Sequence, residues 1–333
     1  MTSLPLLPDL DLSPKLIGIA RLAAAGESLR EGHNVEYFTL GIRSLLSRVV
    51  SERNLPFSWA INPYRGCEFA CKYCYARYTH EFMELRDGVD FERKIFVKQH
   101  AAALLRSELK KVKRGEGIAI GTATDPYQPA ERRFEVTLAI LEELALHSGL
   151  SIGIVTKSNL ITRDAGILRR VGECNRVSVS VTVTTLDTEL ARKLEPRAPR
   201  PDLRLEAVRQ LNLAGIYAGV NCAPVLPEIT DRPRDLEALV KAASEAGAKH
   251  IHVGPLFLKP CSAAVFLPFL EENFPDLVKL YRARYADRAF LPKEYAQRLS
   301  KLMTAYCQKY KIGAGRTRDS RKVYSEAEQM KLF

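Results

Sequence analysis

The sequence predicts an α/β fold in which a parallel sheet carries helices on its outside and curls into a barrel or partial barrel. The first observation is an alternation, along residues 57–256, of six short segments rich in Ile, Val and Thr with segments of helical periodicity. The second is the composition of the 333 residues, which are 46% hydrophobic and 27% charged, as in globular proteins. Because parallel strands are joined by right-handed crossovers, such units curve in one direction.

Each predicted strand is short, apolar and bounded by Gly, Pro or Asn. The six strands are predicted at residues 57–61, 118–124, 152–157, 177–183, 217–225 and 250–256. Apolar residues and their spacing predict helices within residues 98–113, 134–145, 202–213 and 236–243. The helices fall between strands, which is the order that a parallel sheet requires.

Segments at both ends of this repeat are predicted to lie outside the barrel. The predicted division is an N-terminal extension at residues 1–54, the barrel at 55–260, C-terminal helices at 261–310 and a basic mobile tail at 311–333. Helical stretches in these flanks are predicted at residues 14–24, 40–51, 266–285 and 293–310. The C-terminal helices are placed to close the open side of the barrel.

The sequence indicates a cytoplasmic protein with no membrane segment. The longest uncharged run, residues 210–227, contains Asn, Gly and Pro residues that do not suit a bilayer. The first residues have no basic segment before an apolar block, so we expect no signal peptide. Because cytoplasmic thiols stay reduced, clustered cysteines are expected to bind a metal or serve in redox chemistry rather than form disulfides.

Three of the seven cysteines, Cys67, Cys71 and Cys74, form the pattern C-x3-C-x2-C. A structural zinc site needs four ligands, usually as two spaced pairs, and the chain has no second C-x2-C pair. A [4Fe–4S] cluster usually takes four thiolates, so three thiolates leave one iron open to an amine and a carboxylate, such as the methionine part of S-adenosylmethionine (SAM). Three core thiols, or a zinc site completed by a distant Cys or His, are the alternatives.

The pattern C-x3-C-x-aromatic-C, with Tyr73 before the last cysteine, resembles the signature of the radical SAM superfamily. Four further motifs resemble its spore photoproduct lyase-like branch. They are Asn-Pro-Tyr-Arg-Gly-Cys at 62–67, Cys-Tyr-Ala-Arg at 74–77, Gly-Thr-Ala-Thr-Asp-Pro-Tyr-Gln-Pro-Ala-Glu at 121–131 and Thr-Lys-Ser at 156–158. The similarity covers roughly residues 55–260. It implies a (β/α)6 partial TIM barrel with a [4Fe–4S] cluster on Cys67, Cys71 and Cys74. It also implies that, with an external electron donor, SAM is cleaved to a 5′-deoxyadenosyl radical.

The active site is expected at the C-terminal ends of the strands, where the loops of a β/α barrel converge. Lys157 supplies a cation for the SAM carboxylate, and hydroxyl and carboxylate side chains suit the ribose and the amine. The resemblance implies SAM contacts at the end of the second strand and at the Lys and Ser of strands three and four. At the second strand end this chain has Gly-Thr-Ala-Thr-Asp instead of the commoner Gly-Gly-Glu. The candidate contacts are Tyr73, Thr122, Thr124, Asp125, Lys157, Ser180 and Thr182.

Each candidate contact also has an ordinary structural interpretation. Inward Ser and Thr side chains often only pack or bond the backbone, and Lys157 can be a surface charge. Asp125 can cap the helix after Pro126.

Two lone cysteines, Cys222 and Cys261, are candidate hydrogen-atom donors near the mouth of the barrel. The alternative is that they are small core hydrophobes. His250 and His252 share one face of a strand, where a structural role is more common than ligation.

The charge suggests a polyanionic partner, because 50 Lys and Arg against 39 Asp and Glu give a net charge of +11. Tyrosines near the mouth or in the tail, such as Tyr75, Tyr78, Tyr127 and Tyr324, suit base stacking. A solvated basic surface is the alternative. The last five residues, 329–333, resemble the peptide that binds the bacterial sliding clamp, with Gln329, Leu332 and Phe333 as anchors.

The sequence thus predicts a radical SAM enzyme acting on DNA, as a repair lyase does. One rival is a radical SAM enzyme that modifies RNA or protein. Another is a non-catalytic nucleic-acid-binding protein with a structural zinc or iron–sulfur site.

Overall fold

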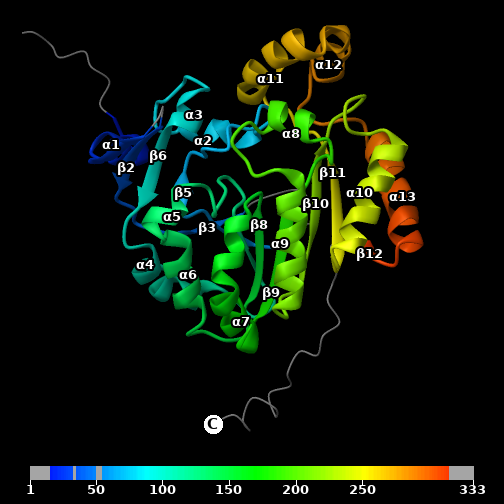
Figure 1. Ribbon diagram of the computed structural model, residues 1–333. Helices are drawn as coiled ribbons and strands as arrows, with labels where there is room; N and C mark the ends of the chain where they lie inside the picture. The colour runs from blue at the N-terminus through cyan, green and yellow to red at the C-terminus, as the bar shows by residue number, and fades with distance from the viewer. Residues whose placement is uncertain (1–15, 33–34, 50–54, 315–333) are drawn as a thin grey trace, which may run out of the picture.

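A computed structural model describes residues 16–32, 35–49 and 55–314. Its centre is an eight-stranded sheet in the order β12-β11-β10-β9-β8-β7-β4-β3. The six predicted parallel strands are all present, as β4 (Trp59–Ile61), β7 (Gly117–Ile120), β8 (Ser151–Thr156), β9 (Arg176–Thr182), β10 (Ala218–Val225) and β11 (His250–Pro255). The predicted α/β class is confirmed. Since β12 and β3 end the sheet without pairing, this part of the chain forms an open barrel (Figure 1).

Two further strands extend the sheet. β12 (Gly313–Ala314) lies parallel to β11, and β3 (Leu46–Arg48) lies antiparallel to β4. The strand predicted at residues 118–124 is shorter than expected, because the chain turns at Gly121, whose φ is +90°. The polar residues after it are therefore in a loop and not in the sheet.

Helices cover the outer face of the sheet, as the pattern predicts (Figure 1). These are α4 (Ala101–Glu108), α6 (Val136–Leu144), α7 (Ala165–Cys174), α9 (Pro201–Leu213), α10 (Pro233–Glu245) and α13 (Lys293–Lys309). Along β8, Ile152 and Ile154 are buried against the helices, while the alternate residues Gly153 and Val155 face the interior of the barrel. Alternation along each strand thus assigns one face to the core and one to the site.

A second, four-stranded sheet was not predicted. Its order is β1 (Ser28–Gly32), β2 (Val35–Leu40), β6 (Lys94–Lys98) and β5 (Tyr64–Arg65). The predicted helix at residues 14–24 is present in part as α1 (Gly18–Ala24), but the helix predicted at 40–51 is wrong, since residues 46–48 form β3. Pairing of Leu46 with Ile61 buries both side chains, and this long-range contact outweighs the local helical spacing.

The C-terminal segment begins with α11 (Pro260–Asn273), which is followed by η4 (Pro275–Leu277) and α12 (Val278–Arg284). The single helix predicted at 266–285 is therefore wrong. Pro275 disfavours a helical conformation in the residue before it, and Phe274 has φ −146° and ψ 57°. α11 and α12 lie above the C-terminal strand ends, while α13 packs beside α10 and β11 (Figure 1).

The remaining elements are short and lie mostly in the loops that follow the strands. They are η1 (Tyr75–Arg77), α2 (Tyr78–Glu81), α3 (Asp90–Arg93), η2 (Leu109–Lys111), α5 (Glu131–Phe134), η3 (Asn159–Asp164) and α8 (Thr188–Leu194). Across residues 16–32, 35–49 and 55–314, no helix combines the length and apolar character that crossing a membrane demands.

Candidate functional site

Cys67, Cys71 and Cys74 lie on one loop between β5 and η1, at the C-terminal edge of the main sheet. The loop is anchored at its start, where the Cys67 N–H donates to the Phe91 carbonyl at 2.8 Å. Gly66 has φ +83°, and a Cβ there would lie 2.7 Å from the Lys94 carbonyl oxygen. The turn into the loop therefore requires glycine.

The three thiols are close enough to influence one another electrostatically. Burial, with repulsion from the neighbouring Asp125 and the other thiols, raises the pKa of Cys67 well above its usual value. Burial is also the main cause that raises the pKa of Cys71, to about 12. A positive centre is needed to hold such thiols as thiolates, and bound iron supplies one.

The arrangement of the three thiols is compatible with a cluster. Among the described residues, no three His, Cys, Asp or Glu side chains surround one point where a single metal ion could bind. In a [4Fe–4S] cluster each thiolate binds a different iron, so the sulfurs need not converge on one point. The donor set of three cysteines on one loop therefore fits the cluster that the spacing implies.

The motif at residues 121–131 holds the cysteine loop in place. The Thr124 hydroxyl donates to the Gly66 carbonyl at 2.6 Å, and the Gln128 amide donates to the same oxygen at 3.2 Å. The Glu68 N–H donates to Gln128 Oε1 at 2.9 Å, and Glu68 Oε1 accepts from the Ala130 N–H at 2.7 Å. Thr124 was predicted as a SAM contact, and the structure places its hydroxyl against the loop backbone.

Thr122 lies where the end of β4 contacts the end of β7. Asn62 donates to Thr122 Oγ1 at 3.2 Å and accepts from the Ala123 N–H at 2.8 Å. The Tyr75 hydroxyl donates to the Thr122 carbonyl. This residue therefore joins the first two strand ends to the segment that follows the third cysteine.

Asp125 connects the ends of β7 and β8. Its carboxylate accepts from the Thr156 hydroxyl at 2.6 Å, from the Lys157 N–H at 2.7 Å and from the Tyr127 N–H at 2.9 Å. It is 9% exposed. The structure thus gives Asp125 a role that sequence reasoning did not consider, which is to fix the backbone of Lys157.

Lys157 lies beside the cysteine loop. Its Nζ atom is 5.7 Å from the centre of the Tyr73 ring, within the range of a cation–π contact. Burial disfavours its charge, but the nearby Cys71 and Glu195 outweigh burial and raise the pKa of Lys157 above its usual value. The side chain therefore remains a cation that can pair with the carboxylate of a ligand.

A buried ion pair, Glu195 with Arg204, supports this corner of the site. Arg204 Nη1 lies 2.5 Å from Glu195 Oε2. The Arg204 side chain is 1% exposed and the Glu195 side chain is 0% exposed. Arg204 also donates to the Thr182 carbonyl at 3.1 Å, and the Tyr73 hydroxyl donates to Glu195. The pair thus ties the cysteine loop to the end of β9.

Sequence reasoning missed both of these residues. Glu195 follows the short helix α8 and Arg204 lies in a run of basic residues, so neither has a spacing that marks it. Only their burial shows that they differ from the surface charges around them.

Ser180 and Thr182 both face the interior of the barrel from β9. The Ser180 hydroxyl is 2.9 Å from His250 Nε2, and Thr182 Oγ1 accepts from the Asn221 amide at 3.2 Å. Burial lowers the pKa of His250 to about 4, so its ring is neutral and structural. Ser180 is therefore engaged inside the barrel, while Thr182 ends the strand close to Arg204.

The two candidate hydrogen donors lie in different places. Cys222 is fully buried on β10, in the cluster that includes Leu236 and Val240 of α10, while Asn221 beside it points to the barrel interior. The sheet therefore separates Cys222 from the cysteine loop. Cys261, on α11, is partly exposed and has its Sγ 3.9 Å from the Tyr75 carbonyl oxygen. The structure brings Cys261 to the cysteine loop.

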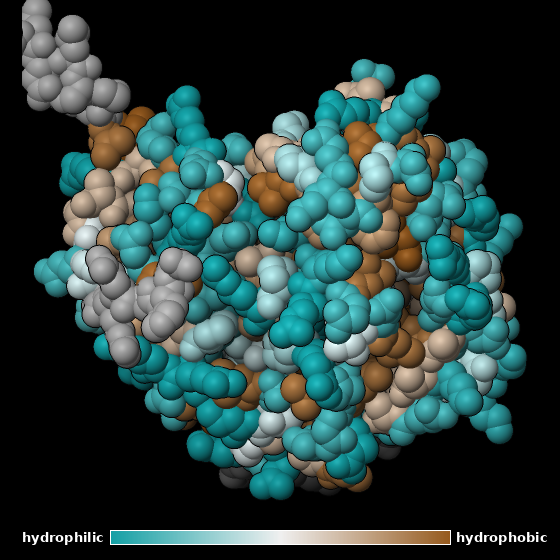
Figure 2. Space-filling model, turned by 45° about the horizontal axis from the view of Figure 1, so that its top comes forward, coloured by the Kyte–Doolittle hydropathy of each residue, from teal (hydrophilic) through white to brown (hydrophobic). Residues whose placement is uncertain are grey.

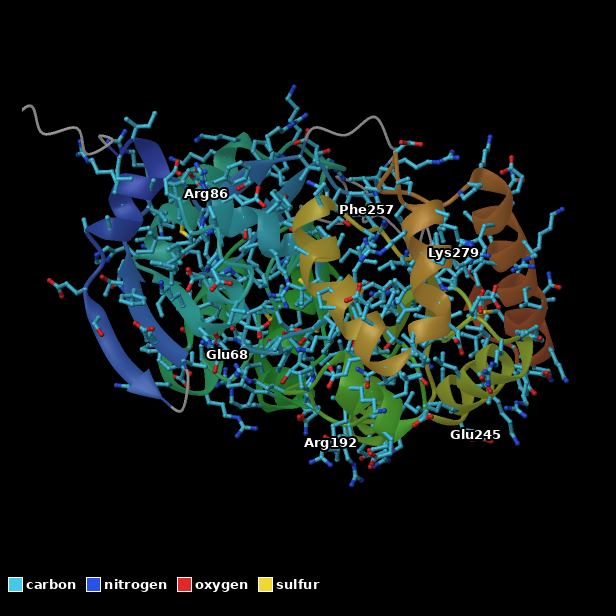
Figure 3. All side chains as sticks on the ribbon, turned by 90° about the horizontal axis from the view of Figure 1, so that it is seen from above. Glu68, Arg86, Arg192, Glu245, Phe257 and Lys279 are labelled. Carbon is cyan, nitrogen blue, oxygen red and sulfur yellow. The ribbon has the colours of Figure 1, made fainter. Side chains whose placement is uncertain are left out.

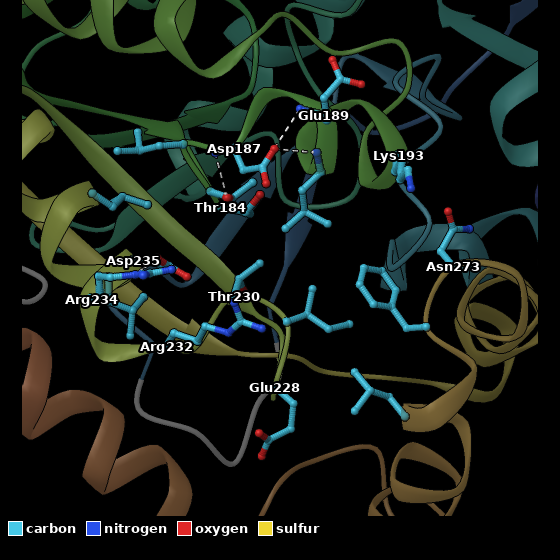
Figure 4. A pocket seen from close by; sticks show the side chains of 18 of the residues that line it. Thr184, Asp187, Glu189, Lys193, Glu228, Thr230, Arg232, Arg234, Asp235 and Asn273 are labelled. Carbon is cyan, nitrogen blue, oxygen red and sulfur yellow. Dashed lines mark hydrogen bonds and ion pairs between the residues drawn. The ribbon is translucent and has the colours of Figure 1, made fainter.

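A cavity of about 710 Å³ lies beside this site, between α8, the loop before α10 and the turn from α11 to α12 (Figure 4). Leu190, Ile229 and Phe274 line it and also belong to the apolar cluster that packs against Cys67 and Cys71. The cavity therefore borders the same apolar cluster as the cysteine loop.

Comparisons with known proteins give the class. The model of the radical SAM superfamily matches residues 61–243. An uncharacterized protein of Mycobacterium tuberculosis (strain ATCC 25618 / H37Rv) is 37% identical over 271 residues, covering 81% of this chain and 79% of the relative. An uncharacterized protein of Methanocaldococcus jannaschii is 26% identical over 233 residues, covering 70% and 83%. The chain belongs to the radical SAM superfamily and is an enzyme of that class.

The fold is similar to that of spore photoproduct lyase. A double mutant of that lyase, solved with bound AdoMet and dinucleoside spore photoproduct, has a TM-score of 0.63 at 17% identity. The similarity covers 92% of this chain and 86% of the lyase chain. Within the superfamily, this chain therefore has a fold like that of the lyase.

Proposed function

We propose that this protein binds a [4Fe–4S] cluster on Cys67, Cys71 and Cys74 and cleaves SAM reductively in order to act on DNA. The observation that supports it is the position of three neighbouring thiols on one loop beside the Lys157 ammonium. When bound and reduced by an external donor, the cluster supplies the electron that converts SAM to methionine and a 5′-deoxyadenosyl radical.

The residues of the chain bind and orient SAM. Lys157 pairs with the SAM carboxylate, and the Asp125 carboxylate holds the backbone that presents this lysine. Tyr73, fixed by Glu195, presents its ring beside the same position. Thr182, at the end of β9, accepts a hydrogen bond from Asn221 and keeps its O–H to donate to a ligand. The Thr124 hydroxyl already donates to Gly66, and Ser180 lies against His250.

A DNA substrate is supported by charge and by the fold relative. The net charge of +11 suits a polyanion, and the similar lyase structure contains a dinucleoside photoproduct. The predicted sliding-clamp peptide at residues 329–333 lies outside the described residues. It remains a prediction that favours DNA over RNA or protein. Deleting these five residues should abolish binding to purified clamp, and unchanged binding would contradict it.

Anaerobic purification tests the cluster and SAM chemistry. We expect a brown protein that holds iron and sulfide and releases 5′-deoxyadenosine from SAM when dithionite is added. Cys71→Ala should lose the colour and the product, while Cys174→Ala, at an exposed cysteine far from the loop, should keep both. A colourless protein with one zinc would contradict the cluster and favour the nucleic-acid-binding module instead.

Lys157 provides a second test, of SAM binding alone. Removing a charge-assisted contact costs about 1.5–3 kcal/mol, so Lys157→Met should weaken SAM binding about 10- to 100-fold. Lys157→Arg should keep part of the affinity because it keeps the charge. Calorimetric titration of SAM into the anaerobic protein measures both. Equal affinity in Lys157→Met would remove the lysine from the SAM site.

The substrate is identified by digesting DNA and RNA from cells that lack the protein. Mass spectrometry should find a modified nucleoside that accumulates or disappears in the DNA. A change confined to RNA would favour the RNA-modifying alternative.

A further inference from the structure

A group of four aromatic side chains and one lysine borders the cysteine loop, and we call it the aromatic rim. It consists of Tyr75, Tyr78, Phe257, Lys259 and Phe290. The Tyr75 ring, directly after Cys74, is 5.8 Å from the Phe257 ring, which stacks on Phe290 at 4.3 Å and an angle of 19°. Lys259 Nζ lies 3.7 Å from the centre of the Tyr78 ring. Figure 3 looks onto the C-terminal strand ends and labels Phe257 beside α11.

The rim is built by two segments far apart in the sequence. Phe257 and Phe290 form an isolated antiparallel bridge, and the Leu258 N–H donates to the Ala289 carbonyl at 2.9 Å. On the other side, the Tyr75 hydroxyl donates to the Thr122 carbonyl. These contacts between protein groups hold the rings in position. Phe257 and Phe290 also lie outside residues 61–243, which match the superfamily model.

The rim remains partly open to solvent. Tyr75 is 38% exposed and Phe290 is 40% exposed, although both are large aromatic side chains. The upper face, which comes forward in Figure 2, is mainly hydrophilic and exposes apolar side chains in separate groups. A broad apolar interface for a protein partner would need a larger continuous patch.

Cations accompany the exposed rings. Lys259 belongs to the rim, and Arg288 is exposed two residues before Phe290. Stacked aromatic rings next to Lys and Arg are the combination that binds unpaired bases and the phosphates beside them. A lipid surface would not account for ordered stacking in fixed positions, whereas a planar base matches it.

We propose that the aromatic rim stacks an unpaired base of single-stranded or locally opened nucleic acid, so that a neighbouring nucleotide reaches the cysteine loop. This inference rests on the proposed nucleic-acid substrate and adds the strandedness of that substrate and the surface that selects it. Lys259 and Arg288 contact the phosphates on either side of the stacked base. Duplex DNA, whose bases are covered by their neighbours, binds less well.

The test uses the full-length protein with single-stranded oligonucleotides that carry 2-aminopurine, whose fluorescence falls when it stacks on an aromatic ring. We expect quenching by the wild-type protein and about tenfold or more weaker binding by Phe290→Ala. Phe290→Trp should restore binding and quenching, which loss of local folding alone would not allow. Leu213→Ala, at a 73% exposed leucine on α9, is the matched control and should bind as wild type.

Two outcomes would overturn the inference. One is equal affinity of wild type and Phe290→Ala for the single strand. The other is equal affinity of the wild type for the single strand and the matched duplex, with no quenching. Release of 5′-deoxyadenosine by the wild type, measured without nucleic acid, tests the proposed SAM chemistry separately. A wild type that cleaves SAM but binds no nucleic acid would refute both the rim and the DNA substrate, and leave the SAM chemistry standing.

Discussion

Three charged side chains next to the cysteine loop, Lys157, Glu195 and Arg204, behave as one unit at the scale of residues. The Glu195 carboxylate favours the cationic form of Lys157 despite burial. Glu195 is in turn held ionised despite its burial, because Arg204 and Lys157 lower its pKa. Arg204 has no solvent to replace its partner, since 1% of its side chain is exposed. The ionised form of Glu195 therefore depends on the two cations beside it.

Removing Arg204 should be strongly destabilising. In Arg204→Met the buried Glu195 carboxylate loses its partner, and the free energy of unfolding should fall by about 3–5 kcal/mol. Arg209→Met, on the same helix, breaks an exposed pair with Glu206 and should cost far less, because water screens that pair. Urea unfolding at neutral pH measures both. Equal losses in the two variants would contradict this account.

The buried histidine inside the barrel gives the protein a pH dependence. The pKa of His250 is lowered by burial from 6.5 to about 4, so the unfolded chain binds more protons between these values. Stability from this residue is therefore present above pH 6.5 and is lost as the pH falls towards 4, by about 3 kcal/mol.

Replacing this histidine should reduce the slope of the unfolding free energy against pH. His80 has its pKa lowered in the same way, so His250→Gln should retain about half of the histidine-linked slope of unfolding free energy against pH. Urea unfolding between pH 7 and pH 4 measures it. An unchanged slope would mean that His250 binds protons equally in the folded and unfolded chains, which contradicts the lowered pKa.

At the scale of elements, the cysteine loop depends on contacts from three directions. The β6 and α3 segments approach Gly66 from one side, and Thr124 of the 121–131 motif donates to the Gly66 carbonyl from another. On the third side, the Lys72 N–H donates to the Leu194 carbonyl at 2.9 Å. These contacts fix the backbone of the loop on three sides. Its shape comes from the surrounding elements more than from its own sequence.

Gly66→Ala tests that shape. A methyl group would lie 2.7 Å from the Lys94 carbonyl oxygen in a left-handed backbone conformation, so we expect a loss of about 1–3 kcal/mol and reduced iron content. Gly166→Ala is the matched control in α7, where a Cβ has no neighbour within 4 Å. It should stabilise the protein by about 0.5–1 kcal/mol. Iron analysis and thermal unfolding distinguish the two, and normal iron loading in Gly66→Ala would contradict the requirement.

At the scale of the whole molecule, the open barrel, the second sheet and the C-terminal helices meet around one edge. α11 and α12 lie over the strand ends, and the second sheet lies beside the cysteine loop through β5 and β6 (Figure 1). The site is thus bordered by β5 and β6, within the residues that match the superfamily model, and by α11 and α12 beyond them. The net charge of +11 acts on every partner that approaches this edge.

Binding of nucleic acid should be strongly salt-dependent as a result of this charge. If three or more phosphates are contacted, the affinity for a single strand should fall about tenfold or more between about 50 and 200 mM salt. Fluorescence anisotropy across that range gives the slope. An affinity that does not change with salt would argue against phosphate contacts.

The sequence by itself determined the strand and helix order of the main sheet and the loop with three cysteines. Both are written in short-range patterns, which are the alternation of apolar residues and the C-x3-C-x2-C spacing. It also predicted Lys157 as a cation in the site, because the charge of a lysine at a strand end does not depend on the conformation of the loop.

Tertiary structure alone decided which polar side chains remain available to a ligand. Thr124 and Asp125 looked like SAM contacts, yet they bond Gly66 and Thr156, which are 58 and 31 residues away along the chain. Glu195 and Arg204 became a central pair only when the chain buried them together. A hydrogen bond or ion pair between distant segments leaves no local pattern, because its energy depends on burial and distance that exist only after folding.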